Sequence, residues 1–246
     1  MICTICEQPI EDGEAYKRHG RSGPTGGMLP TSYTHNRCRR RPSIVPFIAS
    51  WSSEIAADDP AVICRPFLDG IGYSGEIASD RDERGVLWLR RRESRKVGDP
   101  LYGAVHSGRQ RRAMAELLCQ VCGEPADQDD RGVLWMLENN REDWQGWPED
   151  LLTTHPPACL GCLRKAREEC PHMWAGSVAV RVGKSAVCAV YGRRYTLGRL
   201  GPLVAAADVV ALTSPLIGWT VASQLVRSLS DCTIVSLDEE LAAAHP

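Results

Sequence analysis

The chain of 246 residues has few phenylalanines and few lysines. With two Phe, its large aromatic side chains are mainly seven Trp and six Tyr. We therefore expect bound metal to add stability that a modest core does not supply. The scarcity of Lys leaves Arg as the main cation. Arginine best matches phosphate and carboxylate groups, although a genome rich in Arg codons would give the same composition.

Long apolar runs are also missing. A membrane-spanning helix needs about 20 consecutive apolar residues, and the closest stretch, 201–222, is interrupted by Asp208, Pro215 and Gly218. Met1 leads directly into a cysteine pair, without the charged and apolar segments of a secretory signal. The net charge of −2 gives no overall attraction to nucleic acid or to a membrane. These absences predict a cytoplasmic protein without membrane association.

Cysteine, by contrast, is abundant, with 11 residues. In a reducing cytoplasm paired cysteines bind metal more often than they form disulfides. Two C-x2-C pairs have the spacing with which four thiolates hold a tetrahedral zinc ion. They are Cys119, Cys122, Cys159 and Cys162. A closed set of four thiolates predicts a structural zinc ion rather than a catalytic one.

A second set of candidate ligands lies near the N-terminus. It consists of Cys3, Cys6, His35 and Cys38. Three thiolates and one imidazole are a common structural zinc set, so the sequence predicts two zinc ions. His155, Cys170 and His172 stay open as replacement ligands for the later site. The isolated Cys64, Cys188 and Cys232 are expected to be small buried apolar side chains.

The middle of the chain contains two similar segments. Residues 75–88 and 123–135 share a Gly-Glu start and the run Arg-Gly-Val-Leu-Trp, which predicts a tandem duplication. Ser74 stands in the earlier copy where Cys122 stands in the later one, and the second cysteine pair is also missing there. The earlier copy is therefore expected to keep the scaffold without the metal.

The order of the later copy is cysteine pair, hairpin, cysteine pair, helix. This is the order of a treble-clef zinc finger, and the expected helix is 163–169, whose N-terminus favours thiolate charge. A basic helix is expected over 108–118. In the last part, we expect strands over 178–182, 186–191, 208–212 and 233–237. Helical periodicity and a proline in the first turn predict a helix over 215–229.

These patterns predict an α+β protein, in which small treble-clef-like zinc units, one of them a metal-free copy, pack with a C-terminal α+β module. The expected units are 1–42 (N-terminal zinc-binding unit), 43–63 (linker), 64–118 (metal-free repeat), 119–176 (zinc-binding repeat) and 177–246 (α+β module).

Two families of zinc-containing enzymes are locally similar. Residues 111–123 resemble the opening of HNH endonucleases, which also build a treble clef and place a general-base His on its hairpin. No His follows Gly123 until His155, so the resemblance implies the fold without machinery for phosphodiester hydrolysis. The Cys122-Gly-Glu124 run superficially resembles cytidine deaminases, but Cys119 adds a fourth thiolate that closes the site to water.

A broader resemblance covers most of residues 60–240. The chain is similar there to a family of bacterial proteins from high-GC genomes to which no activity is attached. The segments that carry the likeness are 109–123, 132–135, 144–147, 155–162 and 224–233. The resemblance implies no catalytic residue.

Basic clusters suggest a function for the surface around the zinc sites. The candidate phosphate contacts are Arg37, Arg39, Arg40, Arg41, Arg109, Arg111 and Arg112, and the run 90–92 could join the basic helix in one phosphate-binding face. The sequence thus favours a nucleic-acid-binding or regulatory factor with DNA or RNA as partner. The alternatives are a protein-interaction adaptor that uses acidic segments and exposed Trp as contacts, and an enzyme with its site in the C-terminal module or a cleft between units. Trp144 and Trp147 could form a recognition platform, but a loop pinned onto the domain core is the more common role of such residues.

Overall fold

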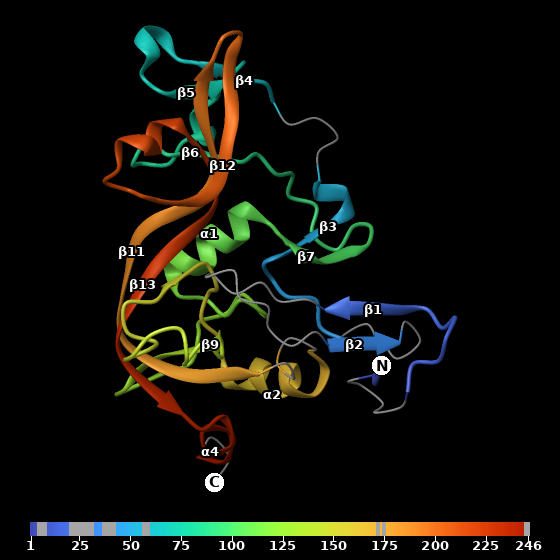
Figure 1. The fold of residues 1–246 in the computed structure, drawn as a ribbon. Coiled ribbons are helices and arrows are strands. Elements are labelled where there is room, and N and C mark those ends of the chain that lie inside the picture. Colours follow the sequence, from blue (N-terminus) through green and yellow to red (C-terminus); the bar gives the residue numbers. More distant parts are fainter. Residues whose placement is uncertain are drawn as a thin grey trace. The chain divides into compact units, whose positions relative to one another are not determined.

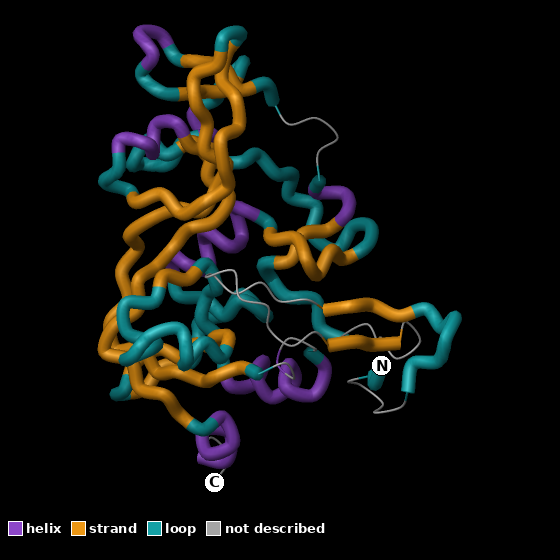
Figure 2. Tube along the Cα trace, viewed as in Figure 1, coloured by secondary structure: helices purple, strands orange, loops and turns teal. Residues whose placement is uncertain are grey.

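The structure is a computed structural model that describes residues 1–3, 9–19, 32–35, 43–55, 60–170, 173 and 176–243. The chain divides into two units, Met1–Ser43 and Ile44–Pro246. It is mixed α and β structure made mostly of strands (Figure 2), with three α-helices among the described residues. No helix in the described part of the chain is long and apolar enough to cross a membrane.

The first unit contains a two-stranded hairpin. Strand β1 (Tyr16–His19) pairs antiparallel with β2 (Ser32–His35). The rings of Tyr16 and Tyr33 meet edge to face, with centroids 5.8 Å apart. Cys3 is buried and forms an isolated bridge to Tyr33, so the first predicted zinc ligand lies beside the hairpin.

The second unit is built on a seven-stranded sheet in the order β10-β13-β11-β9-β8, to which β12 adds beside β11 and β6 beside β13. Its strands are β6 (Leu87–Trp88), β8 (Gln128–Asp129), β9 (Gly132–Glu138), β10 (Leu152–Thr153), β11 (Ser177–Gly198), β12 (Gly201–Ala211) and β13 (Thr220–Val235). The long strands β11 and β13 pair antiparallel along most of their length (Figure 1).

Strand β11 changes partner along its course. Its first part pairs with β9 and its later part with β12. The register with β13 shifts twice, the second time between Tyr191 and Gly192. A Cβ at Gly192 would lie 2.2 Å from the Val221 carbonyl oxygen, so only glycine permits this close approach of the two strands. Such bulges bend a strand, and the bend lets one strand serve both ends of the sheet.

The structure corrects two expectations for the last part of the chain. Residues 178–182 and 186–191 are not separate paired strands but parts of β11. The helix predicted over 215–229 is wrong, because a 3₁₀ helix (Pro215–Trp219) is followed directly by β13. Ser214 caps that short helix through the N–H of Leu216. Beyond it, residues rich in Val, Thr and Ser pair with strands on both sides, and this pairing outweighs the helical spacing of the apolar residues.

Residues 43–63, expected to be a linker, are partly built into the unit. Strand β3 (Ala49–Trp51) pairs with β7 (Pro100–Val105) and leads into a 3₁₀ helix, Ser52–Glu54. Ile48, Ala49 and Glu54 are buried. The other short elements are β4 (Val62–Cys64), β5 (Ile71–Tyr73) and the 3₁₀ helices Pro66–Leu68 and Ala78–Asp80.

Helix α1 (Ser107–Glu116) packs against the sheet at β13. The fully buried side chain of Gln110 accepts the N–H of Leu225 at 2.8 Å and donates to the Leu225 carbonyl at 2.9 Å. These two bonds fix the helix on the central strand. The basic helix predicted over 108–118 is confirmed as a helix, although it spans Ser107–Glu116, and its inner face is part of the core.

The two segments that the sequence aligns as copies begin with similar turns. In 82–88 and 129–135 the leading aspartate accepts the N–H of the arginine two residues on, at 3.0 Å from Arg84 and at 2.9 Å from Arg131. After the turn they differ. Strand β6 pairs in parallel with β13, whereas β9 pairs antiparallel with β11. The duplication stays a prediction.

Candidate metal centre

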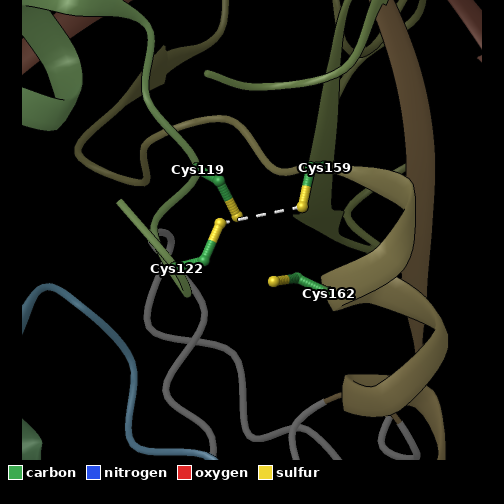
Figure 3. Close-up of side chains that lie close together, drawn as sticks. All are labelled: Cys119, Cys122, Cys159 and Cys162. Carbon is green, nitrogen blue, oxygen red and sulfur yellow. Dashed lines mark hydrogen bonds between the residues drawn. The ribbon is translucent and has the colours of Figure 1, made fainter. Parts of the chain in front are cut away.

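Four cysteine side chains converge in the second unit (Figure 3). Cys119 and Cys122 lie in the loop that follows α1, while Cys159 and Cys162 lie at the start of helix α2 (Leu160–Glu169). Their sulfur atoms all lie within 4.8 Å of one another. The structure thus brings together the four residues that the sequence singled out.

The distances fit a metal site rather than a disulfide. The Sγ atoms of Cys122 and Cys159 are 3.8 Å apart, whereas a disulfide bond is about 2.05 Å long. Four sulfurs at Zn–S distances of about 2.3 Å in a tetrahedron are separated by about 3.8 Å. The donor set and its spacing can therefore hold a metal ion such as zinc.

The first cysteine pair is shaped by backbone hydrogen bonds. The N–H of Cys119 donates to the Glu124 carbonyl at 2.7 Å, and the N–H of Gly123 donates back to the Cys119 carbonyl at 2.8 Å. The N–H of Val121 points at the Cys119 sulfur at 3.4 Å. Gly123 has φ +82°, and its Cα faces the ring of Phe47 so closely that a Cβ would lie 2.8 Å from it. Glycine is required there for both reasons.

The second pair is shaped by a helix. Cys159 is the N-cap of α2, and its carbonyl accepts the N–H groups of Cys162 at 3.1 Å and Leu163 at 3.0 Å. The predicted helix at 163–169 is confirmed and begins three residues earlier. The two cysteines therefore lie at the positive end of the helix dipole.

The two pairs are joined through β9. Leu134 donates its N–H to the Asp127 carbonyl at 2.9 Å and accepts the N–H of Ala158 at 2.9 Å. The apolar side chains around the thiols include Leu134, Ala158 and Leu163, all of them buried. Cys119 is fully buried in this cluster. A rigid hydrogen-bonded frame thus holds both loops in position.

Without a cation, the four thiols cannot all be ionised. Burial raises the pKa of Cys119 to about 11. Burial, together with the neighbouring thiolates of Cys119 and Cys159, also raises the pKa of Cys162 far above its usual value. For Cys122 burial works in the same direction, but the N–H of Glu124 and the neighbouring thiols bring its pKa below the ordinary range. A divalent cation would supply the charge that stabilises all four thiolates.

Other candidate ligands near this centre do not belong to the group. His155 and Cys170 are outside the four-sulfur cluster, and His172 lies outside the described residues. The carbonyl of His155 instead accepts the indole N–H of Trp135 at 3.0 Å. Cys170 ends helix α2.

The predicted N-terminal ligand set falls largely outside the described residues. Cys3 is buried, and His35 ends strand β2. Cys6 and Cys38 are not among the residues that the structure describes. The second zinc site therefore stays a prediction.

A second group of potential ligand side chains consists of Glu54, Glu93 and His106. An arginine occupies it. Arg109 donates to both carboxylate oxygens of Glu54, at 2.7 and 2.6 Å, and to Glu93 at 3.2 Å. The Nδ1 atom of His106 accepts the N–H of Arg109 as the cap of α1. Because a cation would have to displace the guanidinium, this is a buried ion pair and not a metal site.

The structure corrects the role predicted for Arg109. Its side chain is only 5% exposed, and its remaining N–H groups donate to the carbonyls of Phe47 and Ala49 at 2.7 and 2.8 Å. It cannot contact nucleic acid. No local signal in the sequence identified it, because its main partner Glu54 is 55 residues away.

The other predicted basic contacts have different positions. Arg112 is exposed and bonds Glu116 one helical turn away at 3.2 Å. The guanidinium of Arg111 lies 4.7 Å from the ring centroid of Trp88. Arg37, Arg39, Arg40 and Arg41 lie outside the described residues. Trp147 is buried in the core, as expected for a loop pinned onto the domain, and it offers no contact surface, whereas Trp144 is exposed.

Comparison with protein-family models, with curated proteins and with solved structures gave no match to this chain.

Proposed function

We propose that this chain is a zinc protein whose metal is structural and that it works as a nucleic-acid-binding factor. The zinc would be held by Cys119, Cys122, Cys159 and Cys162, and a second ion by the N-terminal set of Cys3, Cys6, His35 and Cys38. The order of cysteine pair, hairpin β8–β9, cysteine pair and helix α2 supports a treble-clef-like arrangement of the first of these sites.

The donor set supports a structural role for the metal. Four thiolates fill a tetrahedral zinc and leave no position for a water molecule. The ion would join the loop after α1 to the start of α2, two segments that are separated by a whole hairpin. Metal binding of this kind contributes on the order of 10 kcal/mol, which is comparable to the whole stability of a domain.

The observation that carries the nucleic-acid proposal is a convergence of arginines. Arg90, Arg91 and Arg92 follow β6, and Arg111 comes from α1, yet all four line one cavity of the second unit. Arginines gathered in this way provide the phosphate contacts on which nucleic-acid affinity chiefly depends. The overall charge of −2 gives no such attraction, so the contact would be confined to this surface.

Salt dependence tests the proposal. Binding of labelled single-stranded DNA and RNA is measured by fluorescence anisotropy between about 50 and 200 mM salt. We expect the logarithm of the affinity to fall linearly with the logarithm of the salt concentration, and Arg111→Gln to reduce the slope by about one. Arg167→Gln, which removes an exposed arginine of α2, is the matched control and should leave the slope unchanged. Absence of binding at the lowest salt concentration would refute the proposal.

A protein-interaction role is the second candidate. The hairpin of β11 and β12 exposes apolar side chains, among them Leu200, Leu203 and Val204. Exposed apolar patches often mark contacts between proteins. Leu203→Ser should then alter the molar mass measured by light scattering, or the mass of complexes formed with a partner, without changing the melting temperature.

A further inference from the structure

The second unit contains a cavity of about 580 Å³, a size typical of small-molecule sites. Three stretches of chain, 77–80, 88–93 and 106–111, form its walls, and Pro60 lies at its edge. It is separate from the four-cysteine cluster, none of whose members line it. The arrangement can therefore be tested independently of the metal.

The charges on its walls do not balance. The lining has four arginines and two carboxylates, Asp80 and Glu93. Asp80 is buried and is held by both ends of the Arg90 guanidinium, one of them at 2.5 Å. Arg90 also donates to the Gly75 carbonyl at 2.9 Å. The Arg90–Asp80 pair therefore neutralises one positive and one negative charge of the lining. It also holds this part of the wall in place.

The second carboxylate is also occupied. Glu93 is 3.2 Å from a guanidinium nitrogen of Arg109, which comes from behind the cavity and is not part of its lining. The described residues provide no carboxylate partner for Arg92 or Arg111. The cavity thus keeps at least two guanidinium groups that no carboxylate of the described residues neutralises.

Arg111 is held through its guanidinium and Arg92 through its main chain. Arg111 lies over the ring of Trp88, and this ring is itself held by a bond of 3.1 Å from its N–H to Asp82. The carbonyl of Arg92 lies 3.1 Å from the Nε2 atom of the buried His106. Because Nδ1 of His106 accepts a hydrogen bond, Nε2 carries the proton and donates to this carbonyl. The main chain of Arg92 is therefore fixed against the start of α1.

The start of α1 adds neutral donors to the same wall. The first N–H groups of a helix have no partner within the helix. That of Arg109 is taken by His106, whereas those of Ser107 and Gly108 donate to no acceptor among the described residues. Both residues line the cavity. The cavity lining thus combines two guanidiniums with two amide donors, the groups that bind a small oxyanion.

We propose that this cavity binds a phosphate monoester, either the terminal phosphate of a nucleic-acid strand or a free nucleoside monophosphate. A terminal phosphate carries close to two negative charges at neutral pH, which corresponds to the two guanidiniums without a carboxylate partner. A phosphodiester within a strand carries one charge and continues on both sides, so a concave site suits it less well. The organic part of the ester would lie on Ile77 and Leu89, two of the apolar residues of the lining.

The inference refines the proposed nucleic-acid function, in that it names the group that is bound. The test uses the full-length, zinc-loaded protein and three probes: a 5′-phosphorylated oligonucleotide, the same strand with a 5′-hydroxyl, and adenosine monophosphate. We expect the phosphorylated strand or the monophosphate to bind, the phosphorylated strand about tenfold more tightly than the hydroxyl strand. Arg92→Gln and Arg111→Gln should each weaken that binding about tenfold.

Arg167→Gln is again the matched control, because it removes one exposed arginine that does not line the cavity. It should keep the preference for the phosphorylated probe. Zinc content and melting temperature show that each variant is folded. If Arg111→Gln fails to fold, the affinity of Arg92→Gln for the phosphorylated probe tests the proposal by itself. The side chain of Arg92 is exposed and stacks on no aromatic ring of the described residues, so its replacement should not affect folding.

The outcomes separate the two proposals. If the monophosphate binds in an Arg92- and Arg111-dependent manner while neither strand binds, the cavity is a nucleotide site and the nucleic-acid function falls. If both strands bind equally well and the double variant Arg92→Gln/Arg111→Gln binds them as the wild type does, this inference is overturned and the nucleic-acid function survives. If none of the three probes binds at millimolar concentration, the cavity is not a phosphate site.

Discussion

The sulfur of Cys122 lies 3.8 Å from the sulfur of Cys159, although 36 residues stand between them in the sequence. One belongs to a loop and the other caps a helix. This distance equals the edge of a sulfur tetrahedron that can hold a metal ion such as zinc. The tertiary structure has thus produced, from two distant segments, the geometry that one metal ion requires.

We expect the purified protein to contain two zinc ions and Cys159→Ser to lose one of them. With one thiolate missing, the remaining three hold zinc weakly, and the loop after α1 is no longer fastened to α2. The variant should unfold or aggregate. Elemental analysis and thermal melting measure both effects. Cys170→Ser, at the end of the same helix, is the control and should keep its metal, and a well-folded Cys159→Ser protein with wild-type melting would contradict a structural zinc.

Glu124→Gln should leave the protein folded and fully metal-loaded. Its backbone carbonyl, and not its exposed side chain, supports the cysteine loop through the N–H of Cys119. A carboxylate that served as a proton donor beside a catalytic zinc would behave differently, because its loss would leave the fold intact and abolish an activity. We expect the zinc content and the free energy of unfolding of this variant to equal those of the wild type.

Glu54→Gln should lower the free energy of unfolding by about 3 kcal/mol, since it leaves the buried Arg109 charge with an incomplete set of partners. The same change at Glu116, whose partner Arg112 is exposed, should cost less than about 1 kcal/mol. Urea titrations of the two variants at neutral pH measure both values. Equal losses would show that burial of the pair has no energetic consequence.

The contribution of Glu54 should depend on pH. Burial alone would raise its pKa, but Arg109 and the N–H groups of Trp51 and Ser94 bring the pKa down from 4.5 to about 2. Between these values the unfolded chain binds a proton that the folded chain does not. The stabilisation is therefore complete above pH 4.5 and is lost as the pH falls toward 2. The difference in unfolding free energy between the wild type and Glu54→Gln should shrink in that range, and a constant difference would contradict the assignment.

Glu240→Gln should loosen the C-terminal helix α4 (Leu237–Ala243). Its carboxylate bonds the buried Arg181 at 3.1 Å and Arg131 at 2.7 Å. Arg181 keeps a second partner in Asp127 at 2.6 Å, so we expect a loss of about 1–3 kcal/mol rather than complete unfolding. Hydrogen exchange should become faster in α4 before it does in β11. Glu239→Gln, an exposed neighbour, should change neither quantity.

The sequence alone predicted the features that depend on short-range chemistry. A gap of two residues places two thiolates on one ion whatever the rest of the fold does, so Cys119, Cys122, Cys159 and Cys162 were identifiable from spacing. The helices α1 and α2 were also predicted, the first from a basic stretch and the second from the order of cysteine pairs and hairpin.

Only the tertiary structure decided the features that depend on distant partners. Residues 215–229 have helical spacing, yet β11 on one side and β6 and β10 on the other provide backbone partners, so that 220–229 belong to β13. Arg109 has the sequence context of a surface cation, but Glu54 reaches it from a segment that had the composition of a linker. Arg92 and Arg111 meet in one cavity because α1 is fixed on β13 by Gln110. Hydrogen bonds and ion pairs between segments far apart in the chain leave no periodicity or spacing in the sequence, and for this reason they become visible only in the folded protein.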